Sequence, residues 1–369
     1  MLSGVRDVVL QAPPNLSAEC AVPTAGSVPY FIAAGPDGNL WFTEYLGNQV
    51  AKVTPYCAAT EYPVPTAGSI PTGIVSGPDG NLWFAETGTN KVARVTTSGV
   101  FTEYPVPTIN GDPLFIAPGP DGNLWLTESA NKVAKVTTAG AFTEYPVPTS
   151  VSRPWGIAAG PDGNLWFVEN GGNNVAKVTT SGSFTEYPIP TSNSQPAGIA
   201  AGPDGNLWFT EFNANQVARV TTAGVVTEYP IPTASSQPDG IAAGPDGNVW
   251  FTESNASKLA SVTTAGVITE YPIQTAGSHP YGIAAGPDAN MWFTEGSGQK
   301  VAKLNLHTRS GASQSASGAP PGRTPSTRPT WLRGPAYPGP TRPSQYDPVG
   351  RNETELVPDP DRLPPAFVR

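Results

Sequence analysis

A unit of about 42 residues occurs seven times in this chain, and this repeat limits the fold more than any other feature. Each unit carries the motif Leu-Trp-Phe or a close variant of it. The tryptophans of this motif are Trp41, Trp83, Trp125, Trp166, Trp208, Trp250 and Trp292. Their spacing is 41 or 42 residues throughout, which predicts a repeat architecture in which each unit packs against the next.

Four short runs typical of β-strands follow one another within each unit. In residues 195–232 these runs are GIAA, NLWFTE, VARVT and VVTEYPIP. They are separated by turn signals, namely GPDGN, an Asn-containing turn and TTAG. The fourth run contains proline, which fits an edge strand. Four strands in so short a unit leave no room for a long helix, so each unit is interpreted as one blade of a β-propeller.

The two ends of the repeat region indicate how the blades form a ring. The last unit lacks its fourth run, because no TEYP follows KVAKLNLH, whereas an extra fourth run, SAECAVPT, precedes the first unit. Pairing of residues 17–24 with residues 301–306 would complete the seventh blade and remove the exposed edges of an open array. The sequence therefore predicts an all-β protein, a seven-bladed β-propeller of four-stranded blades over residues 17–307, preceded by a leader segment, 1–16.

Beyond the repeats, the composition changes. Residues 308–369 are rich in Pro, Ser, Gly and Arg, have no periodicity, and contain eight Arg against five acidic residues. Such a segment cannot bury a core, so we expect a disordered tail, with His307 as an exposed residue at its start. Two interpretations of the tail stay open, an interaction arm and an extension without a function of its own.

Charge and hydropathy exclude several classes of partner. The formal net charge of −9 disfavours an electrostatic interaction with nucleic acid or an anionic membrane. No apolar run approaches the length of a membrane span, and the N-terminus reads poorly as a signal peptide. We expect a monomer that is cytoplasmic as the sequence stands, with an extracytoplasmic location as the alternative if a leader precedes residue 1.

The two cysteines fall at the predicted point of ring closure. Cys20 lies in the closing strand of the seventh blade, and Cys57 replaces the usual glycine in the last turn of the first blade. Because these blades are neighbours, we predict a disulfide between them, which would strengthen the closure and imply an oxidising compartment.

Comparison of the seven units separates scaffold positions from variable ones. The near-constant GPDG segments are interpreted as tight turns rather than calcium loops, the Trp residues as packing between blades, and the Lys and Arg of VAKV and VARV as a solvated rim. The residue that opens the first strand varies. These opening residues are Tyr30, Thr72, Leu114, Trp155, Ala197, Asp239 and Tyr281. Since first strands lie innermost, the set would surround the mouth of the central channel and form an asymmetric ligand site.

A glutamate ends the second strand of every unit. The seven residues are Glu44, Glu86, Glu128, Glu169, Glu211, Glu253 and Glu295. Antiparallel pairing places the end of the second strand beside the start of the first, so these carboxylates share one end of the ring with the opening residues. Most are expected to cap backbone N–H groups, and one or two to hold a hard cation.

The composite unit PYGI…GPDGNLWFTE…NKVARVTT…TEYPIPT resembles the virginiamycin B lyases, also called streptogramin B lyases, over residues 17–306. This resemblance implies a seven-bladed propeller that uses Mg²⁺ to open the macrocyclic ester of the antibiotic by elimination. It further implies a histidine that removes the α-proton next to the ester, and a metal ion that polarises the ester carbonyl.

Only part of the family's catalytic set is present at the matching positions. Tyr30 matches a substrate-contacting tyrosine, and Glu295 matches one metal-binding glutamate. The second metal-binding glutamate falls on His279, the catalytic histidine on Tyr281, and a substrate-contacting histidine on Asp239. A tyrosine, with an ordinary pKa of about 10, is a poor general base at neutral pH. Strand alternation would place His279 on the same face as Tyr281.

Three hypotheses about function follow. The first is a propeller that binds a small-molecule or polymeric ligand at the channel mouth without lyase activity; its binding residues would be Tyr30, Thr72, Leu114, Trp155 and Asp239. The second is a Mg²⁺-dependent carbon–oxygen lyase acting on a cyclic ester, with His279 and Tyr281 in a rearranged catalytic set and with Asp239 and Glu295 on the metal. The third is a cell-envelope interaction protein that uses the tail as a tether.

Overall fold

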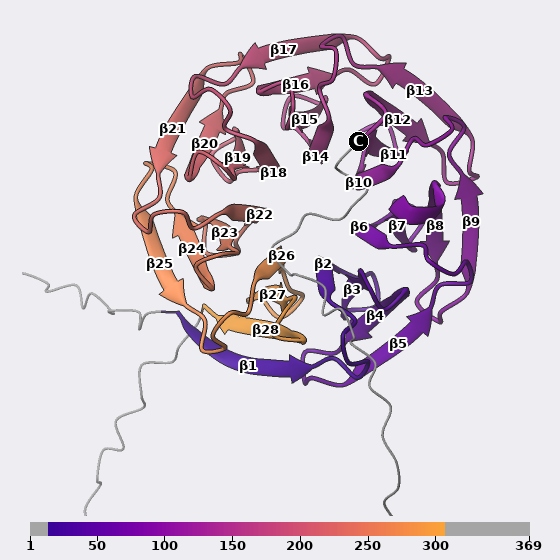
Figure 1. The fold of residues 1–369 in the computed structure, drawn as a ribbon, viewed down its shortest axis with the longest axis vertical. Helices are drawn as coiled ribbons and strands as arrows, with labels where there is room; N and C mark the ends of the chain where they lie inside the picture. Colours follow the sequence, from indigo (N-terminus) through magenta and orange to yellow (C-terminus); the bar gives the residue numbers. More distant parts are fainter. Residues whose placement is uncertain (1–13, 307–369) are drawn as a thin grey trace, which may run out of the picture. The chain divides into compact units, whose positions relative to one another are not determined.

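The computed structural model describes residues 14–306, which form seven four-stranded antiparallel sheets arranged around a central axis (Figure 1). This confirms the predicted seven-bladed β-propeller. The helical structure in this range is one 3₁₀ turn, Thr87–Thr89, and no helix in residues 14–306 is long and apolar enough to cross a membrane. Most of the predicted leader, His307 and the segment 308–369 lie outside the described residues.

Each blade starts at the axis with its first strand and ends at the rim with its fourth (Figure 1). The first strands are β2 (Pro29–Ala34), β6 (Pro71–Ser76), β10 (Pro113–Pro118), β14 (Pro154–Ala159), β18 (Pro196–Ala201), β22 (Pro238–Ala243) and β26 (Pro280–Ala285). The second strands are β3 (Leu40–Glu44), β7 (Leu82–Glu86), β11 (Leu124–Glu128), β15 (Leu165–Glu169), β19 (Leu207–Glu211), β23 (Val249–Glu253) and β27 (Met291–Glu295). The third strands are β4 (Gln49–Val53), β8 (Lys91–Val95), β12 (Lys132–Val136), β16 (Asn174–Val178), β20 (Gln216–Val220), β24 (Lys258–Val262) and β28 (Lys300–Asn305). The fourth strands are β5 (Ala59–Pro63), β9 (Phe101–Pro105), β13 (Phe142–Pro146), β17 (Phe184–Pro188), β21 (Val226–Pro230), β25 (Ile268–Pro272) and, in the seventh blade, β1 (Asn15–Ala21).

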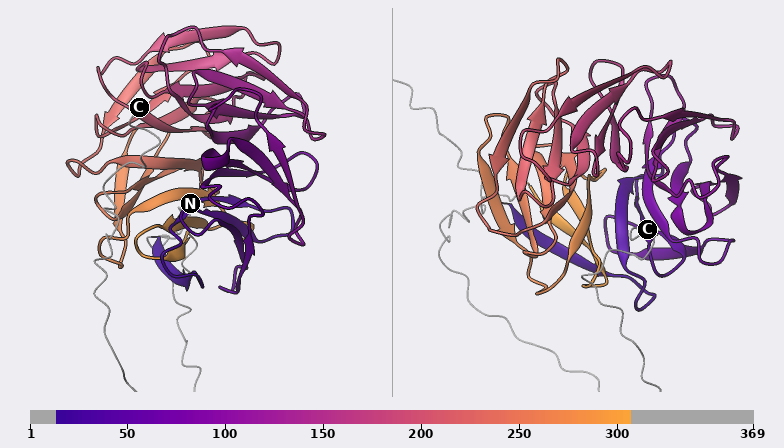
Figure 2. Two further views of the ribbon diagram at one scale, coloured as in Figure 1. Left: turned by 45° about the vertical axis from the view of Figure 1, so that its right-hand side comes forward. Right: turned by 45° about the horizontal axis from the view of Figure 1, so that its top comes forward.

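The ring closes as the sequence predicts, with the N-terminal strand in the last blade. The seventh sheet has the order β1-β28-β27-β26, and Cys20 of β1 pairs with Val301 of β28. Figure 2 shows β1, in indigo, along the outer side of the orange strands of this blade. The observed pairing starts two residues earlier than predicted, at Asn15, and its last strand ends at Asn305.

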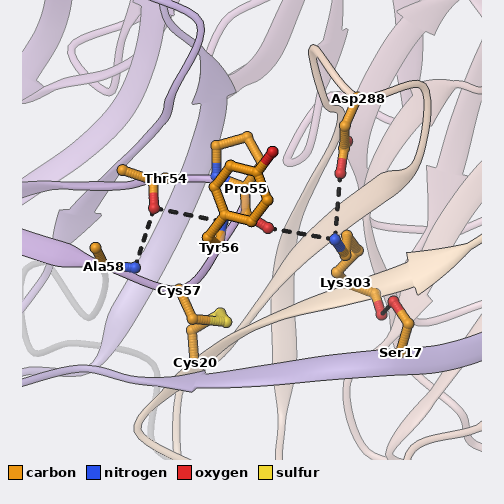
Figure 3. The surroundings of a disulfide bond; sticks show 9 residues. All are labelled: Ser17, Cys20, Thr54, Pro55, Tyr56, Cys57, Ala58, Asp288 and Lys303. Atoms are coloured by element: carbon orange, nitrogen blue, oxygen red, sulfur yellow. Dashed lines mark hydrogen bonds and ion pairs between the residues drawn. A yellow bond between two sulfur atoms is a disulfide. The ribbon is translucent and has the colours of Figure 1, made fainter.

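A disulfide joins Cys20 to Cys57, with their Cα atoms 5.0 Å apart, as predicted (Figure 3). At the corresponding place between the first two blades, the ring of Tyr62 packs against Gly99 so closely that a Cβ on Gly99 would clash with it. Cys20 takes the position of that tyrosine, and Cys57 takes the position of that glycine. The disulfide therefore replaces a packing contact between blades with a covalent bond at the closure.

The tryptophans pack between neighbouring blades, as expected. Trp41 is fully buried in one cluster with Ile74, Leu82 and Phe84 of the second blade. Its indole N–H donates a hydrogen bond to Asp37 of the GPDG turn over 3.0 Å, and all seven blades repeat this bond. The turn aspartates therefore act as acceptors for the scaffold, in agreement with their interpretation as turn residues.

The third-strand cations do not form the solvated rim that the sequence suggested. The Lys52 ammonium lies 5.4 Å from the centre of the Trp41 ring and 3.8 Å from the Asp37 carboxylate. It also donates a hydrogen bond to the carbonyl of Thr97 in the next blade. Because the tryptophan attracts the cation over its face, each such side chain covers the ring. All of them except Arg94 also donate a hydrogen bond to a carbonyl of the next blade.

A second link between blades runs around the outer part of the ring. The Glu103 carboxylate accepts hydrogen bonds from the backbone N–H and the hydroxyl of Thr66, which belongs to the preceding blade. The same pair recurs at every junction, and at the closure it consists of Thr275 and Glu19 of β1. The N-terminal strand therefore reproduces the contacts of an ordinary fourth strand.

Candidate functional site

A bulge in each first strand positions the opening residues. In the first blade Pro29 pairs with Glu44 and Ile32 pairs with Phe42, so Tyr30 and its successor lie opposite a single residue. All seven blades have this irregularity at the same place. A bulge turns side chains away from the regular alternation of a strand. The variable residues therefore occupy equivalent, irregular positions next to the axis.

Threonines of the second strands fix the backbone at these bulges. Thr210, Thr252 and Thr294 each accept a hydrogen bond from a bulge N–H of their own blade, over 2.9 to 3.0 Å. Their hydroxyls donate to carbonyls in the next blade, those of Asp239 (2.7 Å), Tyr281 (2.9 Å) and Tyr30 (2.5 Å). Three adjacent first strands, β22, β26 and β2, are thus held in register through the residues that open them.

Glycine allows the first strands to approach one another closely. A Cβ on Gly198 would lie 2.6 Å from the carbonyl oxygen of Asp239, and a Cβ on Gly282 would lie 2.7 Å from that of Tyr30. Ordinary side chains would not fit at these positions without a shift of the neighbouring strand. The close approach brings the opening residues of neighbouring blades together.

Three tyrosines meet where the first and seventh blades join. The ring of Tyr30 lies 5.0 Å from that of Tyr281 and 5.3 Å from that of Tyr45, measured between ring centres. The ring planes are inclined at 66° and 59°, and all three side chains are half-buried. The Tyr281 ring also packs against Gly296. Inclined arrangements of this kind are favourable between aromatic rings.

Two phenylalanines connect this group to Trp155 of the fourth blade. Phe31 lies 4.5 Å from Tyr30 and 4.7 Å from Phe115, whose ring lies 5.7 Å from that of Trp155. We call Tyr30, Phe31, Tyr45, Phe115, Trp155 and Tyr281 the aromatic centre. It brings together three of the predicted residues, Tyr30, Trp155 and Tyr281, which come from different blades.

Sequence reasoning missed Phe31, Phe115 and Tyr45. In the other five units the position of Phe31 is glycine: Gly73, Gly156, Gly198, Gly240 and Gly282. Comparison of the position that follows each opening residue would have revealed Phe31 and Phe115. The position after each second-strand glutamate varies as well, and Tyr45 occupies it in the first blade.

Asp239 is the acidic member of the site. The residue is 9% exposed, and burial raises the pKa of its carboxyl to about 7. Within residues 14–306 no hydrogen bond or ion pair reaches this carboxylate. The pKa of Tyr30 is raised well above its ordinary value by burial and then by the charges of Asp239, Tyr281 and Tyr45. Asp239 therefore lies close enough to the tyrosines to interact with them electrostatically.

Thr72 and Leu114 have surroundings different from those expected of binding residues. Both are buried, and the Thr72 hydroxyl donates a hydrogen bond to the Leu114 carbonyl over 2.8 Å. Ala85 replaces threonine in this blade, so Thr72 supplies the link that a second-strand threonine supplies in the third, fifth, sixth and seventh blades. These two residues connect the second and third blades.

His279 does not share a strand face with Tyr281, contrary to the alternation argument. It precedes β26 and has a φ of 44°, in the left-handed region. Its Nδ1 lies 3.0 Å from the carbonyl oxygen of Gly277 and 3.0 Å from the hydroxyl of Ser297. Strand periodicity does not apply at a residue with this backbone conformation.

The seven second-strand glutamates are fully buried. In five of them, including Glu295, both carboxyl oxygens lack a hydrogen-bond partner, so they do not cap backbone N–H groups as expected. Burial raises the pKa of every one of them to about 7 or 8. For Glu295 the charge of Glu19 adds to this effect, and Thr275 and Lys300 oppose it.

The two predicted metal ligands have different surroundings. The neighbours of Glu295 are Glu19, Thr275 and Lys300, whereas those of Asp239 include Tyr30. Over residues 14–306, no group of three or more His, Cys, Asp or Glu side chains is arranged to hold a metal ion. Binding of Mg²⁺ by Asp239 and Glu295 stays a prediction.

Comparison with known proteins gives a consistent result. The model of the virginiamycin B lyase family matches residues 12–249 and 108–314. A streptogramin B lyase structure is 36% identical in sequence, with a TM-score of 0.75, and the match covers 78% of this chain and 96% of that one. The virginiamycin B lyase of Staphylococcus aureus, solved with selenomethionine, is 37% identical, with a TM-score of 0.75 and coverage of 78% and 98%.

A catalytically inactive variant of the Staphylococcus aureus enzyme, solved with Quinupristin, is 36% identical with the same TM-score and coverage. No curated protein matches the chain significantly. The family model spans most of the repeat region, and the solved lyases match over nearly their whole length with the same blade architecture. The chain therefore belongs to the virginiamycin B lyase family.

Proposed function

We propose that this protein binds a small-molecule or polymeric ligand at the aromatic centre and Asp239, and that it does not open the streptogramin B ring. The observation that carries this proposal is the surroundings of Tyr281, which stands where the family resemblance places the catalytic histidine. Its ring packs on Tyr30 and Gly296, as a wall of a binding site would.

The composition of the site supports binding. Half-buried aromatic rings offer apolar faces to a ligand while part of each ring stays accessible, and a single buried carboxyl can fix its orientation. Except for Tyr45, all of these side chains come from the bulges of the first strands, where hydrogen bonds between blades hold the backbone. The site therefore requires little rearrangement on binding.

A metal-dependent carbon–oxygen lyase is the second candidate, and one observation favours it. The Asp239 carboxyl, with a pKa of about 7, is suited to accept a proton near neutral pH. This candidate ranks second because His279, Asp239 and Glu295 do not form a shared metal site in the described residues.

Quinupristin and Mg²⁺ provide a direct test. Purified full-length protein is incubated with both, and mass spectrometry is used to look for the linear product. We expect no product beyond that of a reaction without protein, whereas the intrinsic fluorescence should change on binding and change less in Trp155→Phe. Linear product that disappears in Asp239→Asn would overturn the proposal in favour of the lyase, and Tyr281→His serves as the variant closest to the family pattern.

A further inference from the structure

We propose that the ligand of this site carries a positive charge, in the form of an alkylated or quaternary ammonium group held between the tyrosine rings and the Asp239 carboxylate. This inference rests on the proposed binding function and names the chemical class of the ligand. It draws on the arrangement of the rings, the state of Asp239 and the placement of the protein's own cations.

Tyr30 lies between the two other tyrosine rings. Tyr281 and Tyr45 both contact Tyr30, and their planes are inclined to it by 66° and 59°. Rings with such inclinations turn their faces in different directions instead of stacking into one flat layer. Ring faces carry negative potential and attract ammonium groups, most strongly where water is partly excluded. Several inclined rings can therefore surround one cation.

Asp239 provides the charge that a cation needs. The residue is nine-tenths buried. None of the described residues donates a hydrogen bond to its carboxylate or forms an ion pair with it. Burial of a carboxylate without a partner is costly. A cationic ligand would remove this cost, whereas a neutral apolar ligand would bury the carboxyl further and leave it unpaired.

Within residues 14–306, the Lys and Arg side chains that form ion pairs have partners other than Asp239. In residues 14–306, every Lys or Arg that forms an ion pair belongs to a third strand, and its partner is a turn aspartate or a fourth-strand glutamate. Arg153 is exposed and precedes the fourth blade, whereas Asp239 opens the sixth. Asp239 is thus an acid next to aromatic rings with no ion-pair partner among these residues.

A pair of probes with the same shape and different charge tests the proposal. Choline and its neutral isostere 3,3-dimethyl-1-butanol are titrated into the full-length protein by calorimetry at about pH 8. We expect choline to bind on the order of tenfold more tightly, as cation–π and charge attraction together imply. Asp239→Asn should lower the affinity for choline by a similar factor and bring the ratio of the two affinities close to one.

Substitutions at Tyr281 separate the ring face from the hydroxyl. Tyr281→Leu should weaken choline binding on the order of tenfold, whereas Tyr281→Phe, which keeps the face, should stay within about threefold of the original protein. Thermal melting and circular dichroism establish that each variant is folded. If Asp239→Asn does not fold, the proposal is judged from the ratio of the affinities of the unmodified protein for choline and 3,3-dimethyl-1-butanol.

The outcomes are distinguishable from failure of the proposed function. Equal affinity for the two probes would overturn the cationic ligand and leave ligand binding at the aromatic centre intact. Absence of choline binding at concentrations up to tens of millimolar would also overturn it. The proposed function would fail separately, through formation of the linear product in the Quinupristin experiment.

Discussion

Single residues distinguish the candidate site from the repeated scaffold around it. Each first strand has the same bulge, but the side chains there range from glycine to tryptophan. The threonine hydroxyls that link blades next to this site are equally local, because Ala85 and Val168 replace them in the second and fourth blades. In these two blades, the Thr72 hydroxyl and the Asn170 amide donate hydrogen bonds to carbonyls of the next blade instead.

Thr252→Val tests this link at the residue scale. The change removes the acceptor for the Gly240 N–H and the donor to the Tyr281 carbonyl while conserving shape. We expect a loss of about 1–3 kcal/mol in the free energy of unfolding, because buried polar backbone groups are left unpaired. Denaturant unfolding measures the loss, and Val168→Thr, which adds a hydroxyl at the equivalent position, is the matched control. An unchanged free energy for Thr252→Val would contradict the linking role.

The ring closes through the pairing of two strands, β1 and β28. β1 contributes a disulfide and a Thr–Glu contact to the closure, and both tie the N-terminal strand to the neighbouring blades. The cysteines take the places of a tyrosine and a glycine that pack together between other blades. A covalent bond therefore fastens β1, the one fourth strand that does not follow the third strand of its own blade in the sequence, to the first blade.

Reduction of Cys20–Cys57 should destabilise the propeller. The bond closes a loop of 37 residues, for which chain entropy implies about 4 kcal/mol as the ideal contribution. We expect a lower melting temperature in reductant, with Cys20→Ser lowering it by a similar amount and showing no further response to reductant. A control protein with the double change Tyr62→Cys and Gly99→Cys, which bridges a fourth strand already joined in sequence to the third strand of its blade, should gain less. Equal melting temperatures with and without reductant would contradict a stabilising role of the disulfide.

The whole molecule carries a ring of buried glutamates that links its stability to pH. Their pKa values in the folded protein are about 7 or 8, raised by burial, whereas unfolded glutamate titrates near its ordinary value of about 4.3. The folded state thus binds more protons than the unfolded state between these values, so stability falls as pH rises through this interval. The turn aspartates act in the opposite direction at lower pH: burial raises their pKa, but hydrogen bonds from neighbouring Asn and Trp side chains outweigh it and lower the pKa.

Melting temperatures measured from pH 5 to pH 8.5 test this linkage. We expect a higher melting temperature at about pH 5 than at about pH 8.5. The buried carboxyls lose their protons more readily in the unfolded protein than in the folded one, so a rise in pH favours unfolding. Glu211→Gln keeps the shape and removes one titrating group, so its melting temperature should depend less on pH. Glu228→Gln, at an outer glutamate of the same blade, is the control. A melting temperature that rises steadily with pH would contradict the prediction.

The sequence by itself determined the architecture of this protein. Repeat length, strand runs and turn signals predicted seven four-stranded blades, the strand that closes the ring and the pairing of Cys20 with Cys57. These features follow from local periodicity and from the count of units. Both can be read without knowing any side-chain direction.

Only the tertiary structure decided which residues form the site. A bulge and a left-handed residue interrupt the alternation that sequence reasoning assumes, so His279 points toward Ser297 and the second-strand glutamates are buried among outer-strand partners. Thr72 and Leu114 became contacts between blades, whereas Phe31 and Phe115 connected the tyrosines to Trp155. The direction of a side chain at an irregular position depends on the strand packed against it. In this ring that neighbour belongs to another blade, about 42 residues away in the sequence.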